Sequence, residues 1–238
     1  MSSPVATSAL RVLVVVDQQS VAEVIKLTLN HGVYIAREAQ NVGAATTIID
    51  EWRPQIAVID IEAWGDQPLR VTSGALPPGI PHMPVIALTR RGDLRTKLRA
   101  FEQGVDDIMT VPFSPEELLA RVMAVTRRTY RHSGQLAPVI KVGELEIDIL
   151  NREVRVGPSV IHLSGLEQAL LYLLAANAGK VLSRDEIMDV IWGADFVAES
   201  NLVDRHIRNL RVKLQNDWRR PRFIATVPGQ GYRFLPFQ

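Results

Sequence analysis

Three polar side chains stand at the ends of apolar runs, where they could share one site. Asp17 follows the run RVLVVV, Asp60 closes AVID, and Thr89 closes PVIALT. Two carboxylates and a hydroxyl could hold a divalent cation and bind the oxygens of a phosphoryl group. The residue before Asp17 is Val16, which offers no side-chain oxygen. Asp17 is therefore either the remnant of a metal site or a plain strand end, and a phosphatase-like enzyme is one alternative for the chain.

Strands and helices alternate around these side chains. Short apolar runs predict buried strands over residues 11–16, 55–60, 84–89 and 107–111. Helices are expected over residues 20–31, 42–52 and 97–103 and from residue 114 onward, with capping boxes at Ser20-x-x-Glu23 and Ser114-x-x-Glu117. Residues 65–83 carry four prolines and three glycines, which predicts a short or distorted helix there. The alternation predicts a parallel α/β sheet whose sites lie beyond the carboxyl ends of its strands.

The pattern changes after residue 128. Residues 129–138 are polar and poorly periodic, which predicts an exposed linker. Beyond it, ELEIDI and REVRV alternate as half-exposed antiparallel strands do. Capping boxes at Ser164-x-x-Glu167 and Ser183-x-x-Glu186 open two helical runs, a third run covers residues 201–215, and FIATVPGQGYRFLP predicts a terminal hairpin. We therefore expect one domain over residues 1–128 and a winged helix-turn-helix over residues 139–238.

Charge is distributed unevenly along the chain. Residues 1–131 carry 14 basic and 14 acidic groups, and residues 141–200 carry 5 and 10. Residues 201–238 carry 8 basic and 2 acidic groups, a balance of +6 within a chain whose net charge is +1. A basic end on a nearly neutral chain indicates a polyanion as partner.

The third helical run of the second half separates apolar residues from basic ones. One apolar stripe is expected to be buried, and it comprises Val203, Ile207, Leu210 and Leu214. A second stripe lies about 200° around the helix and comprises Asn201, Arg205, Arg208 and Val212. The planar fork of arginine can bind guanine or grip a phosphate, so this stripe predicts a DNA-reading face. Phosphate contacts are expected from Arg211 and Lys213, which flank the apolar stripe, while Arg222 and Arg233 extend the positive surface toward the hairpin. The alternative is an ordinary solvated basic face.

Several motifs of the second half resemble one family of regulators. The segments LSGLEQALLYLLAANAGKVLSRDEIMDVIWG, LVDRHIRNLRVKL and IATVPGQGYRF are similar to the DNA-binding domain of OmpR/PhoB-type response regulators, and the first half resembles their receiver domain. The resemblance implies a flavodoxin-like, doubly wound, parallel five-stranded receiver followed by a winged helix-turn-helix. It implies a homodimer on tandem sites of double-stranded promoter DNA, with RNA polymerase as a further partner. Pro228 stands where these regulators often have a basic residue.

The resemblance also assigns roles to the polar strand ends. Asp60 matches the phosphoacceptor, Asp17 the second of two metal-binding acids, and Thr89 the hydroxyl that binds phosphoryl oxygens. Val16 replaces the first acid and Val111 replaces the phosphate-binding lysine. We therefore expect a receiver that works without phosphorylation, with no cofactor, no metal and no cognate histidine kinase. The alternative is a conventional regulator phosphorylated at Asp60, which would need Mg²⁺.

A receiver without phosphorylation chemistry can still pair two chains. In the family, helices and a strand of the receiver pair about a two-fold axis through salt bridges. Two ion pairs match that arrangement: Lys97 with Glu117, and Asp106 or Asp107 with Arg121. Because a two-fold axis repeats every contact, these pairs predict a retained dimer interface.

Composition excludes several other classes of protein. The chain has no cysteine, which excludes disulfides, thiol nucleophiles and thiolate metal sites. No long uncharged apolar window and no leader-like start are present, so we expect a cytoplasmic protein with no membrane partner. We expect a transcription regulator and not an enzyme, and the remaining alternative is an interaction adaptor whose winged helix binds no DNA.

Overall fold

The computed structural model describes residues 9–30, 33–64, 82–130, 139–149, 151–193, 201–214 and 219–235, together with Phe196 and Asp217. These residues form two compact units. Most of the proline-rich segment 65–83 lies outside the described residues, and so do residues 131–138 of the expected linker. The first two residues of that linker are helical, because the preceding helix continues to Tyr130. The domain boundaries at residues 128 and 139 stay a prediction.

One unit is built on a five-stranded sheet with the order β2-β1-β3-β4-β5. Its strands are β1 (Leu10–Val15), β2 (Tyr34–Glu38), β3 (Ile56–Asp60), β4 (Val85–Thr89) and β5 (Asp107–Thr110). All neighbours are parallel, so the predicted parallel sheet is confirmed. The register pairs Asp60 with Leu88, which brings the carboxyl ends of β3 and β4 together.

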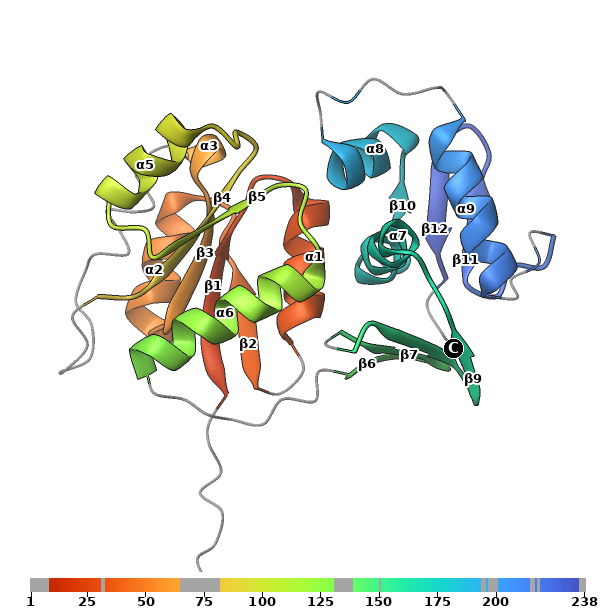
Figure 1. Cartoon of the computed structure of the whole chain (residues 1–238), viewed down its shortest axis with the longest axis horizontal. Helices are drawn as coiled ribbons and strands as arrows, with labels where there is room; N and C mark the ends of the chain where they lie inside the picture. The colour runs from red at the N-terminus through yellow and green to blue at the C-terminus, as the bar shows by residue number, and fades with distance from the viewer. Residues whose placement is uncertain are drawn as a thin grey trace, which may run out of the picture. The chain divides into compact units, whose positions relative to one another are not determined.

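Among the described residues, four helices lie between these strands along the chain and a fifth follows β5. They are α1 (Gln19–Leu29), α2 (Val42–Trp52), α3 (Ile61–Trp64), α5 (Leu94–Glu102) and α6 (Pro115–Tyr130). Figure 1 shows α6 in front of the sheet, and the hydroxyls of Tyr34 on β2 and Thr126 on α6 lie 3.0 Å apart. The predicted cap at Ser114 is present, because its Oγ accepts from the amide of Glu117.

The predicted cap at Ser20 is wrong. Helix α1 already begins at Gln19, and Ser20 is buried within its first turn. The carbonyl of Gln18 accepts from the amides of Val21 and Ala22. The first turn is therefore closed by a main-chain oxygen and not by the hydroxyl of Ser20. A serine followed three residues later by glutamate therefore gave the wrong start.

The core on one face of this sheet follows the alternation of its strands. Leu13 and Val15 of β1 lie beside Ala57 and Ile59 of β3 in one buried cluster, and Ala45 of α2 packs against them. Residues two apart on a strand share a face, so the opposite face receives the intervening residues. Strands apolar on both faces are typical of parallel sheets covered by helices on either side.

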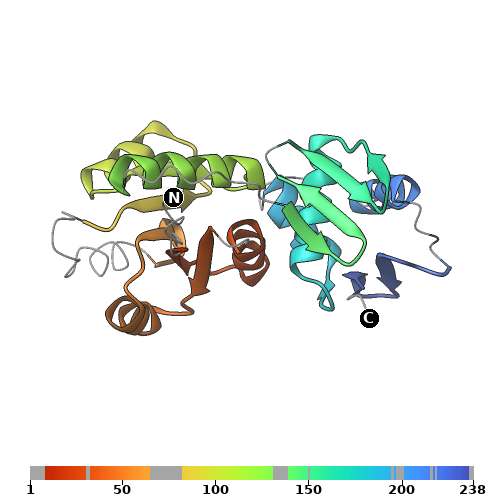
Figure 2. The same cartoon turned by 90° about the horizontal axis from the view of Figure 1, so that it is seen from below.

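In the second half of the chain, the described residues form two small antiparallel sheets and three helices. The first sheet comprises β6 (Val139–Val142), β7 (Leu145–Asp148), β8 (Glu153–Val156) and β9 (Ser159–Ile161), and the second comprises β10 (Val181–Leu182), β12 (Gly231–Phe234) and β11 (Ile224–Val227). The helices are α7 (Gly165–Ala176), α8 (Arg184–Trp192) and α9 (Leu202–Lys213). Figure 1 and Figure 2 show the four-stranded sheet on one side of α7, and α7 contacts α8, α9 and β12. This is the predicted winged helix-turn-helix, with β11 and β12 as its terminal hairpin.

Two capping boxes fix the starts of α7 and α8. Ser164 caps the amide of Glu167 while the carboxylate of Glu167 accepts from the amide of Ser164. Ser183 and Glu186 make the same reciprocal pair at α8. The two capping boxes predicted for this half of the chain are confirmed.

Gly231 allows two strands of the second sheet to approach closely. It begins β12 with a φ of 151°, where β12 runs beside β10. A Cβ atom at this position would lie 2.0 Å from the carbonyl oxygen of Leu182. Only glycine fits here, because the neighbouring atom is main chain and has no side-chain freedom to move away.

Candidate functional site

The carboxyl ends of β3 and β4 bring two of the three polar strand ends together. Asp60 is only 3% exposed, its Oδ1 accepts from the amide of Glu62 at 3.0 Å, and its Oδ2 lies 3.4 Å from Nη2 of Arg90. Thr89 is also buried and follows the same sheet edge. Asp17 follows β1 on an exposed position, while the preceding Val16 is buried.

The carboxylate of Glu62 accepts hydrogen bonds from the donors at and after Thr89. Its Oε1 accepts from the hydroxyl of Thr89 at 2.9 Å and from the amide of Arg91 at 3.0 Å. Its Oε2 accepts from the amide of Arg90 at 3.0 Å. The role of Glu62 could not be predicted from the sequence, because its partners follow 27 to 29 residues later in the chain.

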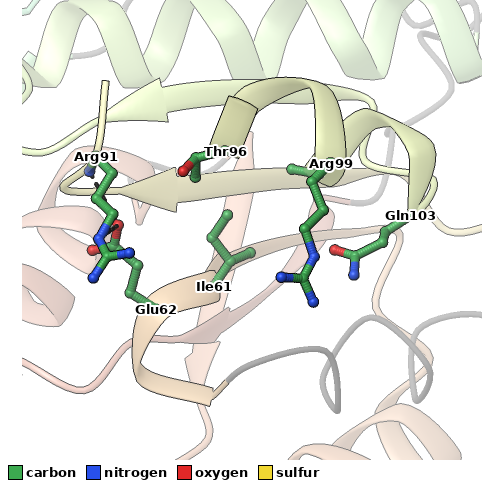
Figure 3. A pocket seen from close by; sticks show the side chains of 7 residues that line it. Ile61, Glu62, Arg91, Thr96, Arg99 and Gln103 are labelled. Carbon is green, nitrogen blue, oxygen red and sulfur yellow. Dashed lines mark hydrogen bonds and ion pairs between the residues drawn. The ribbon is translucent and has the colours of Figure 1, made fainter. Parts of the chain in front are cut away.

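A pocket of about 290 Å³ lies between α3 and α5, beside this carboxylate. Its lining residues are Ile61, Glu62, Arg91, Thr96, Arg99, Ala100 and Gln103. Figure 3 shows Glu62 and Arg91 side by side at one end, with Arg99 and Gln103 at the other. Glu62 thus faces both the pocket and the donors at the end of β4.

The helix α9 presents the two faces expected from the sequence. Its buried residues are Val203, Ile207 and Leu210, and Leu214 at its C-cap is buried too. The residues of the opposite stripe are all exposed: Asn201, Arg205, Arg208 and Val212. Among the residues that the structure describes, Arg205 and Arg208 form no ion pair with an acidic side chain. The guanidinium groups on this face are available to an external anion.

Arg211 joins α9 to the terminal hairpin. Its Nε and Nη2 donate to the carbonyl of Ile224 at 3.1 and 2.8 Å, and Nη2 also donates to Oγ1 of Thr226 at 2.9 Å. Its guanidinium also lies 5.5 Å from the ring centre of Tyr232, within the range of a cation–π interaction. Burial lowers the pKa of Arg211, but arginine stays charged at every physiological pH. This side chain therefore holds the wing as well as carrying positive charge.

A polar cluster ties the start of α9 to α8 and β12. The hydroxyl of Tyr232 donates to Oδ1 of Asp204 at 2.7 Å, and Nε of Arg184 donates to the same oxygen at 2.8 Å. Burial alone would raise the pKa of Asp204, but these two hydrogen bonds outweigh it and hold that pKa below its usual range. Burial, reinforced by the bond to Asp204, raises the pKa of Tyr232 to about 12. The cluster is therefore an ionised carboxylate held by a neutral phenol and a guanidinium.

Among the other residues predicted to bind DNA, two are paired with carboxylates. Lys213 donates to Oε2 of Glu167 at 2.6 Å, and Arg222 bonds to the carboxylate of Glu144. Arg233 lies on β12, and its buried Nε has no hydrogen-bond partner within the described part of the chain. The DNA-binding roles of these residues stay a prediction.

The predicted interface residues on β5 and α6 also make contacts inside one chain. Nη1 of Arg121 donates to both carboxylate oxygens of Asp107, at 3.0 and 2.9 Å. Asp106 accepts from the amide of Val85 at 2.9 Å and contacts Nε2 of His82 at 2.8 Å. The structure therefore places Arg121 next to Asp107 within one chain, and nothing in it tests the contact of Lys97 with Glu117.

An exposed apolar stripe on α5 was missed by the sequence analysis. Leu94, Leu98 and Phe101 are 71%, 52% and 48% exposed. Their spacing of i, i+4 and i+7 puts them on one face of the helix. The periodicity could have revealed this stripe, but the expected helix began only at residue 97 and so left Leu94 out.

Neither a membrane span nor a metal cluster is found in the described residues. No helix among them is both long and apolar enough to cross a membrane. They also contain no group of three or more histidine, cysteine, aspartate or glutamate side chains that could bind a metal ion.

Comparisons with known proteins agree with both halves of the fold. Residues 12–123 match the response regulator receiver domain, and residues 158–234 match the family described as transcriptional regulatory protein, C terminal. The chain is 35% identical to the response regulator MprA of a Mycobacterium species over 93% of this chain and 96% of that protein. It is 32% identical to the phosphate regulon transcriptional regulatory protein PhoB of Klebsiella pneumoniae, over 95% and 98%. The crystal structure of DrrB, a Thermotoga maritima OmpR/PhoB homolog, is 29% identical, covers 95% of this chain and 99% of its own, and has a TM-score of 0.42.

Proposed function

The chain belongs to the OmpR/PhoB family of response regulators, and from this membership we propose that it binds tandem promoter sites as a homodimer without phosphorylation of Asp60. It is a DNA-binding transcription regulator of the two-component type, not an enzyme. The three finer parts of the proposal are the DNA-reading face, the receiver without phosphorylation, and the dimer.

The exposed face of α9 carries the first part. We propose that Asn201, Arg205 and Arg208 contact base edges in the major groove, because they lie opposite the buried stripe and face outward. Arg211 and Lys213 already donate hydrogen bonds to Thr226 and Glu167. We therefore assign them contacts to phosphates that are weaker than the base contacts of Arg205 and Arg208. Arg222 and Arg233 extend the same positive surface toward the hairpin, which enters the adjacent minor groove.

The surroundings of Asp60 support a receiver that works without phosphorylation. Mg²⁺ needs several oxygen ligands in near-octahedral geometry, and Val16 supplies none. One oxygen of Asp60 lies 3.4 Å from the guanidinium of Arg90, and the other accepts from the amide of Glu62. A cation already placed at the carboxylate opposes binding of a divalent metal ion. The residues present do not fit Mg²⁺, and Val111 supplies no cation for a phosphoryl group.

The α5 stripe supports a homodimer through the receiver. Leu94, Leu98 and Phe101 offer an apolar surface that a second copy of the same face can cover. Charges near this surface have the signs that the family interface uses, and they comprise Lys97, Asp106, Asp107, Glu117 and Arg121. We propose that this face pairs two chains before DNA binding, and that promoter-bound dimers act on RNA polymerase.

The test combines sedimentation with DNA titration on the full chain. Wild type and Asp60→Asn should dimerise and bind operator DNA equally well, with and without acetyl phosphate and Mg²⁺. Arg121→Glu should weaken both properties about tenfold, because it places like charges at the interface. Arg127→Glu is the matched control, since residue 127 lies about 240° around α6 from residue 121.

Two results would contradict the proposal. If acetyl phosphate tightens DNA binding of wild type but not of Asp60→Asn, the protein is a conventional regulator that is phosphorylated at Asp60. If neither protein binds any promoter fragment in a gel shift, the winged helix is an adaptor that does not bind DNA.

A further inference from the structure

The loop between β4 and α5 offers several hydrogen-bond donors to one small region. The hydroxyl of Thr89 and the consecutive amides of Arg90 and Arg91 all point at the carboxylate of Glu62, at 2.9 to 3.0 Å. The guanidinium groups of both arginines lie 3.9 Å from its oxygens. A hydroxyl, two neighbouring amides and two cations around one point are the donors of an anion site.

The anion in this site belongs to the chain itself. Both carboxylate oxygens of Glu62 are used, because Oε1 accepts two hydrogen bonds and Oε2 accepts one. The side chain is only 22% exposed, and it reaches the donors from the one-turn helix that follows Asp60. Asp60 reinforces this placement, because its Oδ1 accepts from the amide of Glu62 itself.

We propose that the carboxylate of Glu62 is the resident ligand of this anion site and holds the loop after β4 in its anion-bound arrangement. Thr89 matches the hydroxyl that binds phosphoryl oxygens in the family, so Glu62 fills the donor that a phosphoryl group would need. This inference deepens the proposed independence from phosphorylation: the internal carboxylate replaces the transferred anion and also blocks its place.

The held loop leads directly into the proposed dimer face. It spans the residues between Thr89 and the N-cap of α5, where Asp93 accepts from the amide of Thr96. The first residue of α5 is Leu94, which begins the exposed apolar stripe. Fixing Arg90 and Arg91 by hydrogen bonds therefore fixes the start of the helix that carries this stripe.

The experiment measures amide hydrogen exchange and inorganic phosphate binding by NMR on the full chain. The variants are Glu62→Gln, which keeps the shape of the side chain, and Glu62→Ala, which removes the ligand. The control is Glu102→Gln, which neutralises an exposed carboxylate on α5 outside the site. In wild type the amides of Arg90 and Arg91 should be protected and should not respond to millimolar phosphate.

Loss of the carboxylate should open the site. Exchange at Arg90 should become about tenfold faster in Glu62→Ala and less so in Glu62→Gln, while Glu102→Gln matches wild type. The amide of Arg91 should change less, because it also donates to Oγ1 of Thr89 at 3.0 Å. Phosphate should then shift both amides of Glu62→Ala saturably and restore their protection. Unchanged exchange in both Glu62 variants, or equal phosphate binding by wild type and Glu62→Ala, overturns the inference.

The wild-type measurement stands even if Glu62→Ala fails to fold. Unprotected Arg90 and Arg91 amides in wild type would by themselves exclude a resident carboxylate. Phosphorylation is measured separately: labelling of Asp60 by acetyl phosphate with both amides still protected would overturn the proposed function but support the Glu62 site.

Discussion

The loop after β4 and the outer face of α9 both present positive groups and donors, yet they differ in what satisfies them. At the loop, Glu62 accepts from Thr89 and from the amides of Arg90 and Arg91. On α9, Arg205 and Arg208 face outward without an acidic partner among the described residues. The first region is satisfied from within the chain, whereas for the second we propose an external anion, the phosphates and bases of DNA.

The positions of internal carboxylates decide which basic side chains of this protein are engaged within the fold. A basic side chain near an internal carboxylate donates its hydrogen bonds within the fold, as Lys213 does to Glu167. Arg205 and Arg208, on the face opposite the buried stripe, have no such partner among the described residues, and we propose that their donors bind DNA. Counting basic residues does not distinguish the two groups, but the positions of the carboxylates do.

The largest expected effect comes from disrupting the three-stranded sheet of the winged-helix unit. Gly231→Ala places a Cβ atom 2.0 Å from the carbonyl of Leu182 and should cost the winged-helix unit about 3 kcal/mol. Gly229→Ala is the control, because its φ is also positive at 71° but no atom lies within 4 Å; it should cost only about 1 kcal/mol. Thermal unfolding of the full chain measures both, and equal losses would show that the close approach to β10 is not what requires glycine.

The next effect tests whether the outward arginines read DNA. Arg208→Ala should weaken operator binding by about 1–3 kcal/mol if its guanidinium contacts a base. Arg155→Ala is the control, because Arg155 is paired with Glu153 on β8 and should leave affinity unchanged. Fluorescence titration with operator and scrambled duplexes checks this, and an unchanged operator affinity would mean that α9 does not dock as proposed.

A third substitution places a carboxylate beside an exposed arginine of α9, as Glu62 lies beside Arg90 and Arg91. Val212→Glu puts a carboxylate four residues after Arg208 on the same exposed face, where the two side chains are neighbours. The new charge should compete with DNA and weaken binding about tenfold, with a salt slope smaller by about one. Val212→Gln has nearly the same shape without the charge and should bind nearly as wild type does. Equal weakening by both substitutions would point to shape and not to the internal anion.

The smallest expected effect concerns the internal carboxylate of α9. The pKa of Asp204 is lowered, so its contribution to stability is present above the unfolded pKa of about 4 and is lost as the pH falls through the folded pKa. Wild type should exceed Asp204→Asn in free energy of unfolding at pH 7, and the gap should shrink near pH 3. Because the side chain is 44% exposed, the gap should stay below about 1 kcal/mol in urea titrations. A gap that is equal at both pH values would contradict the pKa direction.

Much of the fold could be predicted because local chemistry and the global structure agree. The boxes at Ser164 and Ser183 form as predicted, and the apolar stripe of α9 is buried as its spacing requires. Strand β2 was not identified, because its residues alternate between buried and exposed over only five positions and include two charges. Ser20 misled for a different reason: the box pattern was present, but tertiary packing buried the serine inside α1.

The candidate site was less predictable than the fold. Asp60 and Thr89 were identified from the strand ends, since the register of β3 and β4 brings such ends together. The role of Glu62 depends on a loop that follows nearly thirty residues later, and periodicity carries no information about such a contact. Likewise, the sequence showed that Arg211 flanks the apolar stripe but not that it bonds to the hairpin.

The hydrogen bonds of Arg211 fix the distance between α9 and the hairpin. Arg211 donates to Ile224 and Thr226. The helix and the hairpin, which we propose enter neighbouring grooves, therefore cannot change their separation independently. A duplex whose groove spacing differs from this distance must itself bend or twist to be bound. The energy of that deformation depends on the base steps of the duplex. We expect promoter preference to extend to base pairs that no side chain touches.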